Sequence, residues 1–244
     1  MIFYIFLYAF SFAQGVPDTQ RALLEFASVT YGSVALFSLS ALAISIASSI
    51  YYASFSLAYG FRYTKLTPLS YLRTLVGSSS ILGVFLSLVM VVSTYGIFSA
   101  KFGFDLAPAD TVAAVLVSAI AGVFMMVFAV LLVLVVVNYV GLRSVGLLTF
   151  VPLILAFGFG LAALSSGLPT TVLYASPYNA IQSLLFTAYS GEAPHAALGN
   201  TLTTALQWQY LLASLGGWVV LLFILDSLLL RRIRPRQIEE GRQI

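Results

Sequence analysis

The residues that most often carry chemistry in proteins are scarce in this chain and do not cluster. Its 244 residues include one histidine and no cysteine, which excludes a thiol nucleophile, a disulfide and a cysteine-ligated metal. Glu192 and His195 lie close together in the sequence and could form a catalytic or metal-binding pair, but a solvated turn is the favoured interpretation. The His-Glu-x-x-His pattern of zinc proteases and the Gly-rich P-loop are both absent. We therefore expect no enzyme activity and no cofactor on this chain.

Strong polar groups are also rare within the long apolar stretches. Asp226 is the one charged residue in them, and ionisable residues at membrane depth often mark ion or proton pathways. We expect Asp226 to pair with Arg231 or Arg232, or to reach the membrane interface, in preference to relaying protons. Asn138 is expected to form a hydrogen bond between helices. If the protein moves a substrate, its energy should come from another subunit.

The composition predicts the kind of protein that must position these few groups. Hydrophobic residues make up 61% of the chain and charged residues only 8%, whereas a soluble domain carries roughly 25% charged residues. A chain of this length with so few charges cannot cover a soluble core. The net charge of +3 comes mostly from a C-terminal basic cluster, which suits an anionic membrane face and gives no reason to expect nucleic acid.

Six apolar stretches predict an all-α integral membrane protein with six transmembrane helices. Residues 1–13 are shorter than the roughly 20 residues that a spanning helix needs. They could be a signal peptide or the outer half of a first span, and the span is favoured because no basic residue precedes Arg21. The predicted spans are about 1–14, 31–59, 75–100, 111–142, 145–164 and 210–230, in one transmembrane domain (1–230) followed by a basic tail (231–244).

The basic residues are divided unequally between the two sets of alternating loops. One set holds nine of the eleven Lys and Arg residues, and the other holds Arg21, Lys101 and five of the eight acidic residues. Because cytoplasmic loops are enriched in Lys and Arg, both termini, the 60–74 loop and the Arg143 turn are expected in the cytoplasm. The 14–30, 101–110 and 165–209 segments are then expected outside a plasma membrane.

Three further helices are expected outside the spans. Pro177 suits the first turn of a helix over 174–186, which would lie in the outer interface or dip partway into the membrane. A second helical stretch is expected over 198–209. On the cytoplasmic side, Thr67 and Pro68 predict the start of a short amphipathic helix, either a stub on the membrane surface or a docking helix for a partner.

Here the sequence resembles the permease subunits of ABC-2 type ABC transporters. The resemblance rests on the loop pattern of Gly60, Leu66, Thr67, Pro68, Leu69 and Ser70, on the start of the outer helix at Ser176-Pro177-Tyr178, and on the order of elements. Two features of the family are missing: an amphipathic helix before the first span, and acidic residues near the loop glycine.

The resemblance implies the transmembrane subunit of an exporter. Such a permease pairs with a second copy or homologue and binds cytoplasmic nucleotide-binding ATPase subunits, which hold the ATP and magnesium. It implies a coupling helix that docks the ATPase, a dimer interface lined by spans one and five, and proline-led outer helices. An apolar route through the permease would suit a lipid-like or amphipathic substrate. The corresponding residues are Thr67, Pro68, Leu69, Ser70, Leu72, Arg73 and Arg143 for docking; Phe157, Gly158, Phe159 and Gly160 for the pathway or dimer interface; and Pro177, Tyr178 and Asn179 for the outer helix.

Two other kinds of protein share much of this composition. The alternative is a non-transporting membrane anchor or structural subunit of a respiratory or secretion complex, which would need neither an ATPase partner nor a docking helix. A membrane-embedded enzyme is third, because no His, Asp or Glu residues cluster in the predicted spans.

Overall fold

The computed structural model describes residues 2–140, 150–165, 169–196 and 204–232, and these residues are mainly helical with no strand among them. This confirms the all-α class. The elements are α1 (Ile2–Leu7), a π-helical turn (Tyr8–Phe12) and a 3-10 turn (Ala13–Gly15), α2 (Gln20–Tyr63), α3 (Pro68–Phe102), α4 (Thr111–Val135) continued by a π-helical turn (Val136–Val140), α6 (Val151–Ser165), α7 (Thr170–Ala175), α8 (Pro177–Ser190) and α9 (Trp208–Leu230).

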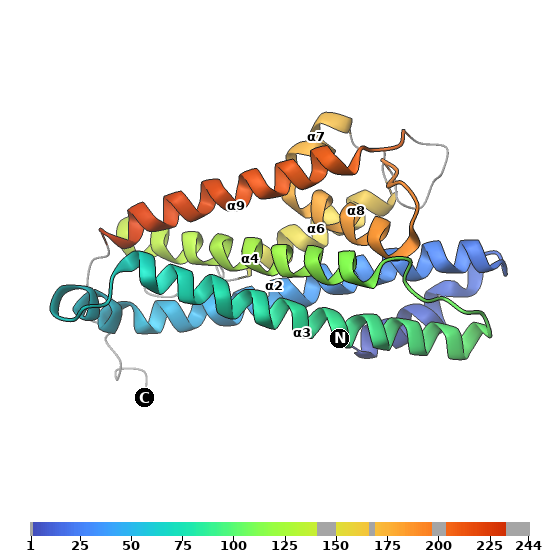
Figure 1. Ribbon diagram of the computed structural model, residues 1–244, viewed down its shortest axis with the longest axis horizontal. Helices are drawn as coiled ribbons and strands as arrows, with labels where there is room; N and C mark the ends of the chain where they lie inside the picture. Colours follow the sequence, from blue (N-terminus) through green and yellow to red (C-terminus); the bar gives the residue numbers. More distant parts are fainter. Residues whose placement is uncertain (1, 141–149, 166–168, 197–203, 233–244) are drawn as a thin grey trace.

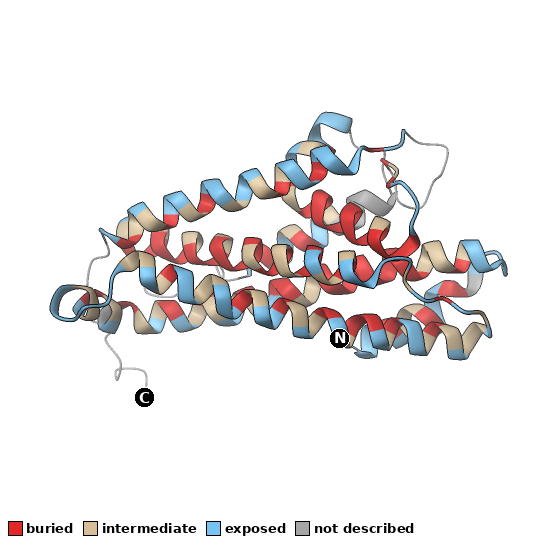
Figure 2. Ribbon diagram, in the orientation of Figure 1, coloured by how far each residue is buried: buried red, intermediate tan, exposed pale blue. Residues whose placement is uncertain are grey.

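The long helices α2, α3, α4 and α9 lie along one axis and form an elongated bundle (Figure 1). α4 is the most deeply buried of them, because α2, α3, α8 and α9 pack around it (Figure 2). The shorter helices α6, α7 and α8 lie over one half of the bundle, and the N-terminal segment packs along α3 in that same half. The two halves of the bundle therefore differ in thickness.

Charged side chains separate to the two ends of this bundle. One end, which we call the acidic end, carries the 103–110 loop, the start of α2 with the residues just before it, and the segment after α8. Its acidic residues are Asp18, Glu25, Asp105, Asp110 and Glu192. The opposite end, which we call the basic end, carries the end of α2, the start of α3 and the end of α9; its described basic residues are Arg62, Lys65, Arg73, Arg231 and Arg232.

Four helices are long and apolar enough to cross a membrane: Gln20–Ser54 within α2, α3, Thr111–Tyr139 and α9. The other two predicted spans correspond to shorter helices. The apolar stretch Ile2–Phe12 is too short to cross alone, and the described part of α6 has 15 residues where roughly 20 are needed. Four potential crossings are thus established, and the six-span count stays a prediction.

The ends of the helices differ from the predicted ones in two places. α2 has 44 residues, a length of about 66 Å, so it extends beyond the predicted 31–59 span at both ends. The short helix expected at Pro68 is not a separate element, because α3 continues from Pro68 to Phe102 without a break.

Local capping explains why several helices begin where they do. The side chain of Thr67 accepts a hydrogen bond from the Ser70 amide at 3.2 Å, with Pro68 in the first turn. Asp110 accepts in the same way from the Ala113 amide at 2.9 Å. These side chains satisfy amide groups that the first turn of a helix leaves unpaired.

α3 and α4 approach closely through small residues. A Cβ atom added to Gly83 would lie 3.1 Å from the carbonyl oxygen of Ser118, and one added to Gly122 would lie 3.2 Å from that of Ser79. Small side chains allow membrane helices to pack backbone against backbone. At this level the Tyr31 hydroxyl from α2 lies 2.9 Å from Ser87 Oγ, which ties a third helix to the pair.

Candidate functional site

α8 is an internal helix of the bundle. Twelve of its fourteen residues are buried, among them Ile181, Leu184 and Leu185, because α2, α4, α6 and α9 all pack against it. A helix at a membrane surface would leave one side exposed. α8 is therefore enclosed by protein and does not lie on the surface of the bundle.

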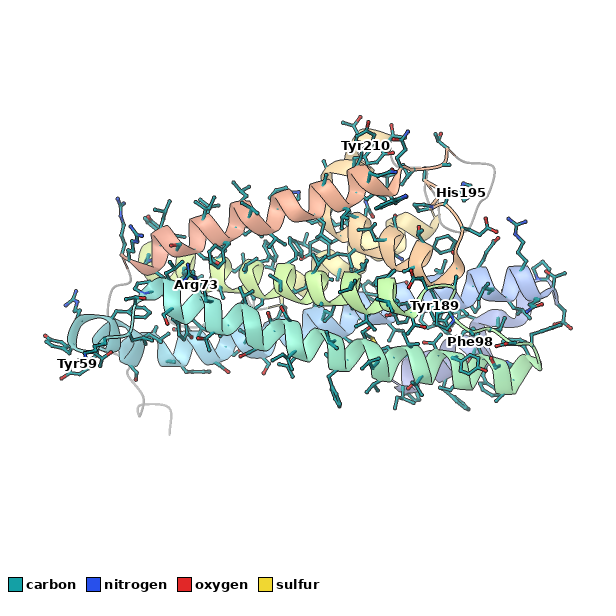
Figure 3. All side chains as sticks on the ribbon, in the orientation of Figure 1. Tyr59, Arg73, Phe98, Tyr189, His195 and Tyr210 are labelled. Atoms are coloured by element: carbon teal, nitrogen blue, oxygen red, sulfur yellow. The ribbon has the colours of Figure 1, made fainter. Side chains whose placement is uncertain are left out.

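The direction of α8 follows from its contacts. At its C-terminal end the Ala109 amide donates to the Tyr189 carbonyl at 2.8 Å, and the Asp110 amide donates to the Ala188 carbonyl at 3.0 Å. At its N-terminal end the ring of Tyr178 packs edge-on against Phe124, near the middle of α4, with ring centres 5.7 Å apart. α8 thus runs from the middle of the bundle to the acidic end, where Figure 3 shows Tyr189.

The buried side of α8 carries polar atoms that have no hydrogen-bond partner among the described residues. The Gln182 amide nitrogen donates to Ser33 Oγ at 3.1 Å, but its oxygen is unpaired, as are the Tyr178 hydroxyl and both amide atoms of Asn179. Most buried polar groups in folded proteins are paired. Unpaired groups gathered at the first two turns of one helix therefore mark this helix as a candidate for a role other than packing.

A cavity of about 380 Å³ lies beside the N-terminal turn of α8. This volume falls within the range of about 300–1,000 Å³ that is usual for small-molecule sites. Its walls come from α4, α6, α9 and the junction between α7 and α8. The lining residues are Phe124, Phe128, Leu155, Phe159, Val172, Ala175, Ser176, Pro177, Tyr178, Trp218 and Leu222.

Aromatic rings form much of the wall of this cavity, which we call the aromatic cavity. Phe124 and Phe128 lie one turn apart on α4 with ring centres 6.0 Å apart, and Phe159 of α6 stacks on Tyr178 at 5.9 Å. On the opposite side the Trp218 indole donates to the Ala175 carbonyl at 2.8 Å, which joins α9 to the end of α7. The walls are almost wholly apolar, so the cavity suits an apolar or amphipathic molecule.

The aromatic cavity opens to the side of the bundle. Two of its lining residues, Val172 and Trp218, expose 41% and 37% of their surface. Both belong to the helices α7 and α9, which face outward in this half of the molecule (Figure 2). A molecule could therefore enter from the apolar surroundings of the bundle without passing either charged end.

The predicted pathway residues on α6 lie on different sides of that helix. Phe159 lines the aromatic cavity, whereas Phe157 is 54% exposed and stacks on Phe37 of α2. A Cβ atom on Gly158 would contact nothing within 4 Å, so this glycine does not permit a close approach within the chain. The side chain environment of Gly160 lies outside the described residues. Of Phe157, Gly158 and Phe159, whose surroundings are described, Phe159 alone joins Pro177 and Tyr178 at one site.

The predicted docking residues at the basic end also divide. Thr67, Ser70 and Arg73 are exposed, and Pro68 and Leu69 are half-buried. Leu72 is completely buried in the core of the bundle, so its assignment to a partner surface is wrong. Arg143 lies outside the described residues. Figure 3 shows Arg73 near the basic end, far from Tyr189.

The prediction that Asp226 pairs with Arg231 or Arg232, or reaches the interface, is also wrong. The predicted hydrogen bond of Asn138 between helices is confirmed. Asp226 is completely buried, and neither carboxyl oxygen has a hydrogen-bond partner among the described residues. The described ion pairs of the chain are both made by Arg21 at the acidic end. The Asn138 amide donates to the Leu229 carbonyl at 3.2 Å, which links the π-helical turn after α4 to α9, one turn from Asp226.

Residues around the one histidine take no part in a metal site among the described residues. Glu192 instead pairs with Arg21 at 2.9 Å, which ties the segment after α8 to the start of α2. His195 forms an isolated β-bridge with Ala205. The helix predicted over 198–209 is also wrong for its described part, because residues 204–207 are not helical and α9 begins at Trp208.

Sequence reasoning missed Phe124, Phe128 and Trp218 as site residues. The signal was weak but present: Phe124 and Phe128 are four residues apart, as are Trp218 and Leu222, so each pair lies on one face of its helix.

Comparison of the chain with protein-family models, with curated proteins and with solved structures finds no match in any of the three.

Proposed function

We propose that this chain is the transmembrane permease subunit of an ABC-2 type exporter. The observation that carries the proposal is α8, a proline-led helix between α6 and α9 that runs from the middle of the bundle to the acidic end and is enclosed by protein. The resemblance to ABC-2 permeases implies a helix of this kind between spans five and six. An enclosed position also satisfies the requirement that a helix ending inside a membrane be covered by protein.

The charges at the two ends support an orientation for the permease. The basic end carries Arg62, Lys65, Arg73, Arg231 and Arg232, and cytoplasmic segments are enriched in such residues. In this proposal the basic end faces the cytoplasm of a plasma membrane, with both termini inside and six spans. The acidic end, and with it the end of α8, then faces outward.

The ATP-binding partner would dock at the basic end, around the first turn of α3. Thr67, Ser70 and Arg73 offer exposed side chains there, and Thr67 fixes the start of the helix by capping it. Because the sequence has no P-loop, ATP and magnesium belong to the partner, and a second permease copy or homologue completes the transporter. Movement of α3 would reach the rest of the bundle through its close packing with α4.

The aromatic cavity suggests the kind of substrate. Its apolar walls and its opening to the side of the bundle suit a lipid-like or amphipathic molecule that enters from the membrane. An ion or a small polar solute would find almost no polar group in these walls. Tyr178 contributes its ring to these walls, because its hydroxyl is fully buried and is not exposed to the cavity.

The docking surface can be tested in a complex with a P-loop ATPase that co-purifies with the chain. Arg73→Glu reverses an exposed charge on the docking surface and should weaken the association and lower ATP hydrolysis by the complex. Asp18→Lys, an exposed charge reversal at the acidic end, is the matched control and should change neither. The proposal fails if no P-loop ATPase co-purifies, as a membrane anchor would predict, or if Arg73→Glu and the control behave alike. Leu72→Asp is unsuitable, because a buried charge would disrupt the fold itself.

The cavity can be tested in the same complex. Ala175→Trp places a large ring at the mouth of the aromatic cavity, where Ala175 is exposed, and should reduce stimulation of ATP hydrolysis by membrane lipids. Thr171→Trp places the same ring on α7 away from the lining and should not. Equal stimulation in the two variants would show that the aromatic cavity is not part of the transport route.

A further inference from the structure

A second pocket, of about 450 Å³, lies at the basic end, far from the aromatic cavity. It is formed where three helix ends meet: the last turns of α2, the first residue of α3 and the end of α9. Its lining residues are Ala58, Phe61, Arg62, Pro68, Leu230, Arg231 and Arg232. We call it the arginine pocket.

The arginine pocket combines a basic mouth with an apolar floor. Arg62, Arg231 and Arg232 are exposed, whereas Ala58 and Leu230 expose only 2% and 1% of their surface. Two of the guanidinium groups follow α9 and one comes from α2, so the charges converge from helices far apart in sequence. Four of the seven lining residues are apolar, in contrast to a purely electrostatic surface patch.

None of these three arginines forms an ion pair with an acidic residue in the described part of the chain. Both described salt bridges lie at the acidic end and involve Arg21. Three guanidinium groups close together repel one another, and an anion between them would relieve this repulsion. Guanidinium groups bind phosphate oxygens through paired hydrogen bonds.

We propose that the arginine pocket binds one anionic phospholipid, with its phosphate among Arg62, Arg231 and Arg232 and its glycerol and upper acyl chain against Phe61 and the apolar floor. The position favours a lipid over an acidic protein segment, because Arg62 lies in the last turn of α2 and Arg231 and Arg232 directly follow α9, both of which are apolar helices long enough to cross a membrane. Basic pockets between membrane helices are suited to anionic headgroups. This inference does not depend on the proposed transport function.

Lipid retention by the purified full-length chain can be measured by native mass spectrometry in a neutral detergent. With added phosphatidylglycerol the wild type should retain one molecule, and with phosphatidylcholine it should retain far less. Arg62→Gln should lower the affinity for phosphatidylglycerol about fivefold, the contribution of one basic residue near a headgroup. Lys65→Gln removes the same charge three residues away, outside the pocket, and should lower it less than twofold.

Several results would overturn the proposal. Equal retention of phosphatidylglycerol and phosphatidylcholine would exclude a charge-selective site. Equal effects of Arg62→Gln and Lys65→Gln would show attraction to the whole basic end, without a built pocket. Displacement of the lipid by inorganic phosphate at matched concentration would show that the apolar floor contributes nothing, so that the site binds a free anion. These readouts do not involve an ATPase, so they fail or succeed separately from the permease proposal.

Discussion

Replacement of Asp226 by valine should make the protein more stable. The Asp226 side chain lies on the buried face of α9 between Leu222 and Leu230, is completely buried, and has no partner for either oxygen among the described residues. An unpaired buried polar group costs about 1–3 kcal/mol. Valine removes that cost and adds apolar contacts, so we expect the free energy of unfolding to rise by about 1–3 kcal/mol.

Two companion variants separate the contributions. Asp226→Asn removes the ionisable carboxyl group but keeps a polar group of nearly the same shape, so the free energy of unfolding should rise less than in Asp226→Val. Asp18→Val changes an exposed carboxyl group at the acidic end and should alter stability by less than about 0.5 kcal/mol, as is usual for surface substitutions. The assay is unfolding by sodium dodecyl sulfate in mixed micelles, followed by circular dichroism.

A loss of stability in Asp226→Val would refute this reasoning. It would mean that the carboxyl group has a partner in the folded protein, so that the valine leaves a charge or donor without its mate. ATP hydrolysis by a complex of the variant gives a second, independent readout. A variant that is more stable but inactive would place Asp226 among the functional groups, since proteins often retain costly polar groups at sites that act.

Three further predictions concern a helix contact, a pair of surface ion pairs and a buried hydrogen bond, and all can be measured in the same unfolding assay. Gly83→Ala should lower the free energy of unfolding by about 1–3 kcal/mol, because the new Cβ would lie 3.1 Å from the Ser118 carbonyl oxygen. Gly77→Ala on the same helix meets open space and should raise it by about 0.5–1 kcal/mol. Arg21→Ala removes two exposed ion pairs and should cost less than about 1 kcal/mol, an effect that high salt should abolish. Tyr31→Phe leaves two buried serine hydroxyls without their shared partner and should cost about 1–2 kcal/mol; no loss in this variant would mean that the serines find other partners.

The sequence predicted best what local interactions decide. The starts of α3 and α8 follow from Thr67-Pro68 and Ser176-Pro177, because a capping side chain and a proline act within one helical turn. The hydrogen bond of Asn138 was predictable as a kind of contact, since a buried amide in an apolar helix needs a partner. Its acceptor, the Leu229 carbonyl, was not predictable, because it depends on which helices lie side by side.

Asp226 shows why nearness in sequence misled the prediction. Arg231 and Arg232 follow it by five and six residues. An α-helix makes one turn every 3.6 residues, so residues four apart share a face, whereas residues five or six apart do not. Asp226 therefore aligns with Leu222 and Leu230 on the buried face, while both arginines are exposed at the end of α9. The face that a helix buries depends on its neighbours, and a uniformly apolar helix gives little sign of it.

The same limit explains α8 and leads to a property of the site. This helix was expected either in the outer interface or partway into the membrane. Packing by α2, α4, α6 and α9 encloses it in the bundle and also buries its polar side, including Asn179 and the Tyr178 hydroxyl. A bilayer offers no water to pair these atoms. The Tyr178 hydroxyl is fully buried and is not exposed to the aromatic cavity, so an occupant would contact the Tyr178 ring and the other apolar walls. Tyr178→Phe removes this unpaired hydroxyl and keeps the ring that packs against Phe124 and Phe159, so it should raise the free energy of unfolding by about 1–3 kcal/mol. For the proposed exporter, Tyr178→Phe should leave the stimulation of ATP hydrolysis by membrane lipids unchanged, whereas Tyr178→Ala, which removes the ring from the cavity wall, should reduce it.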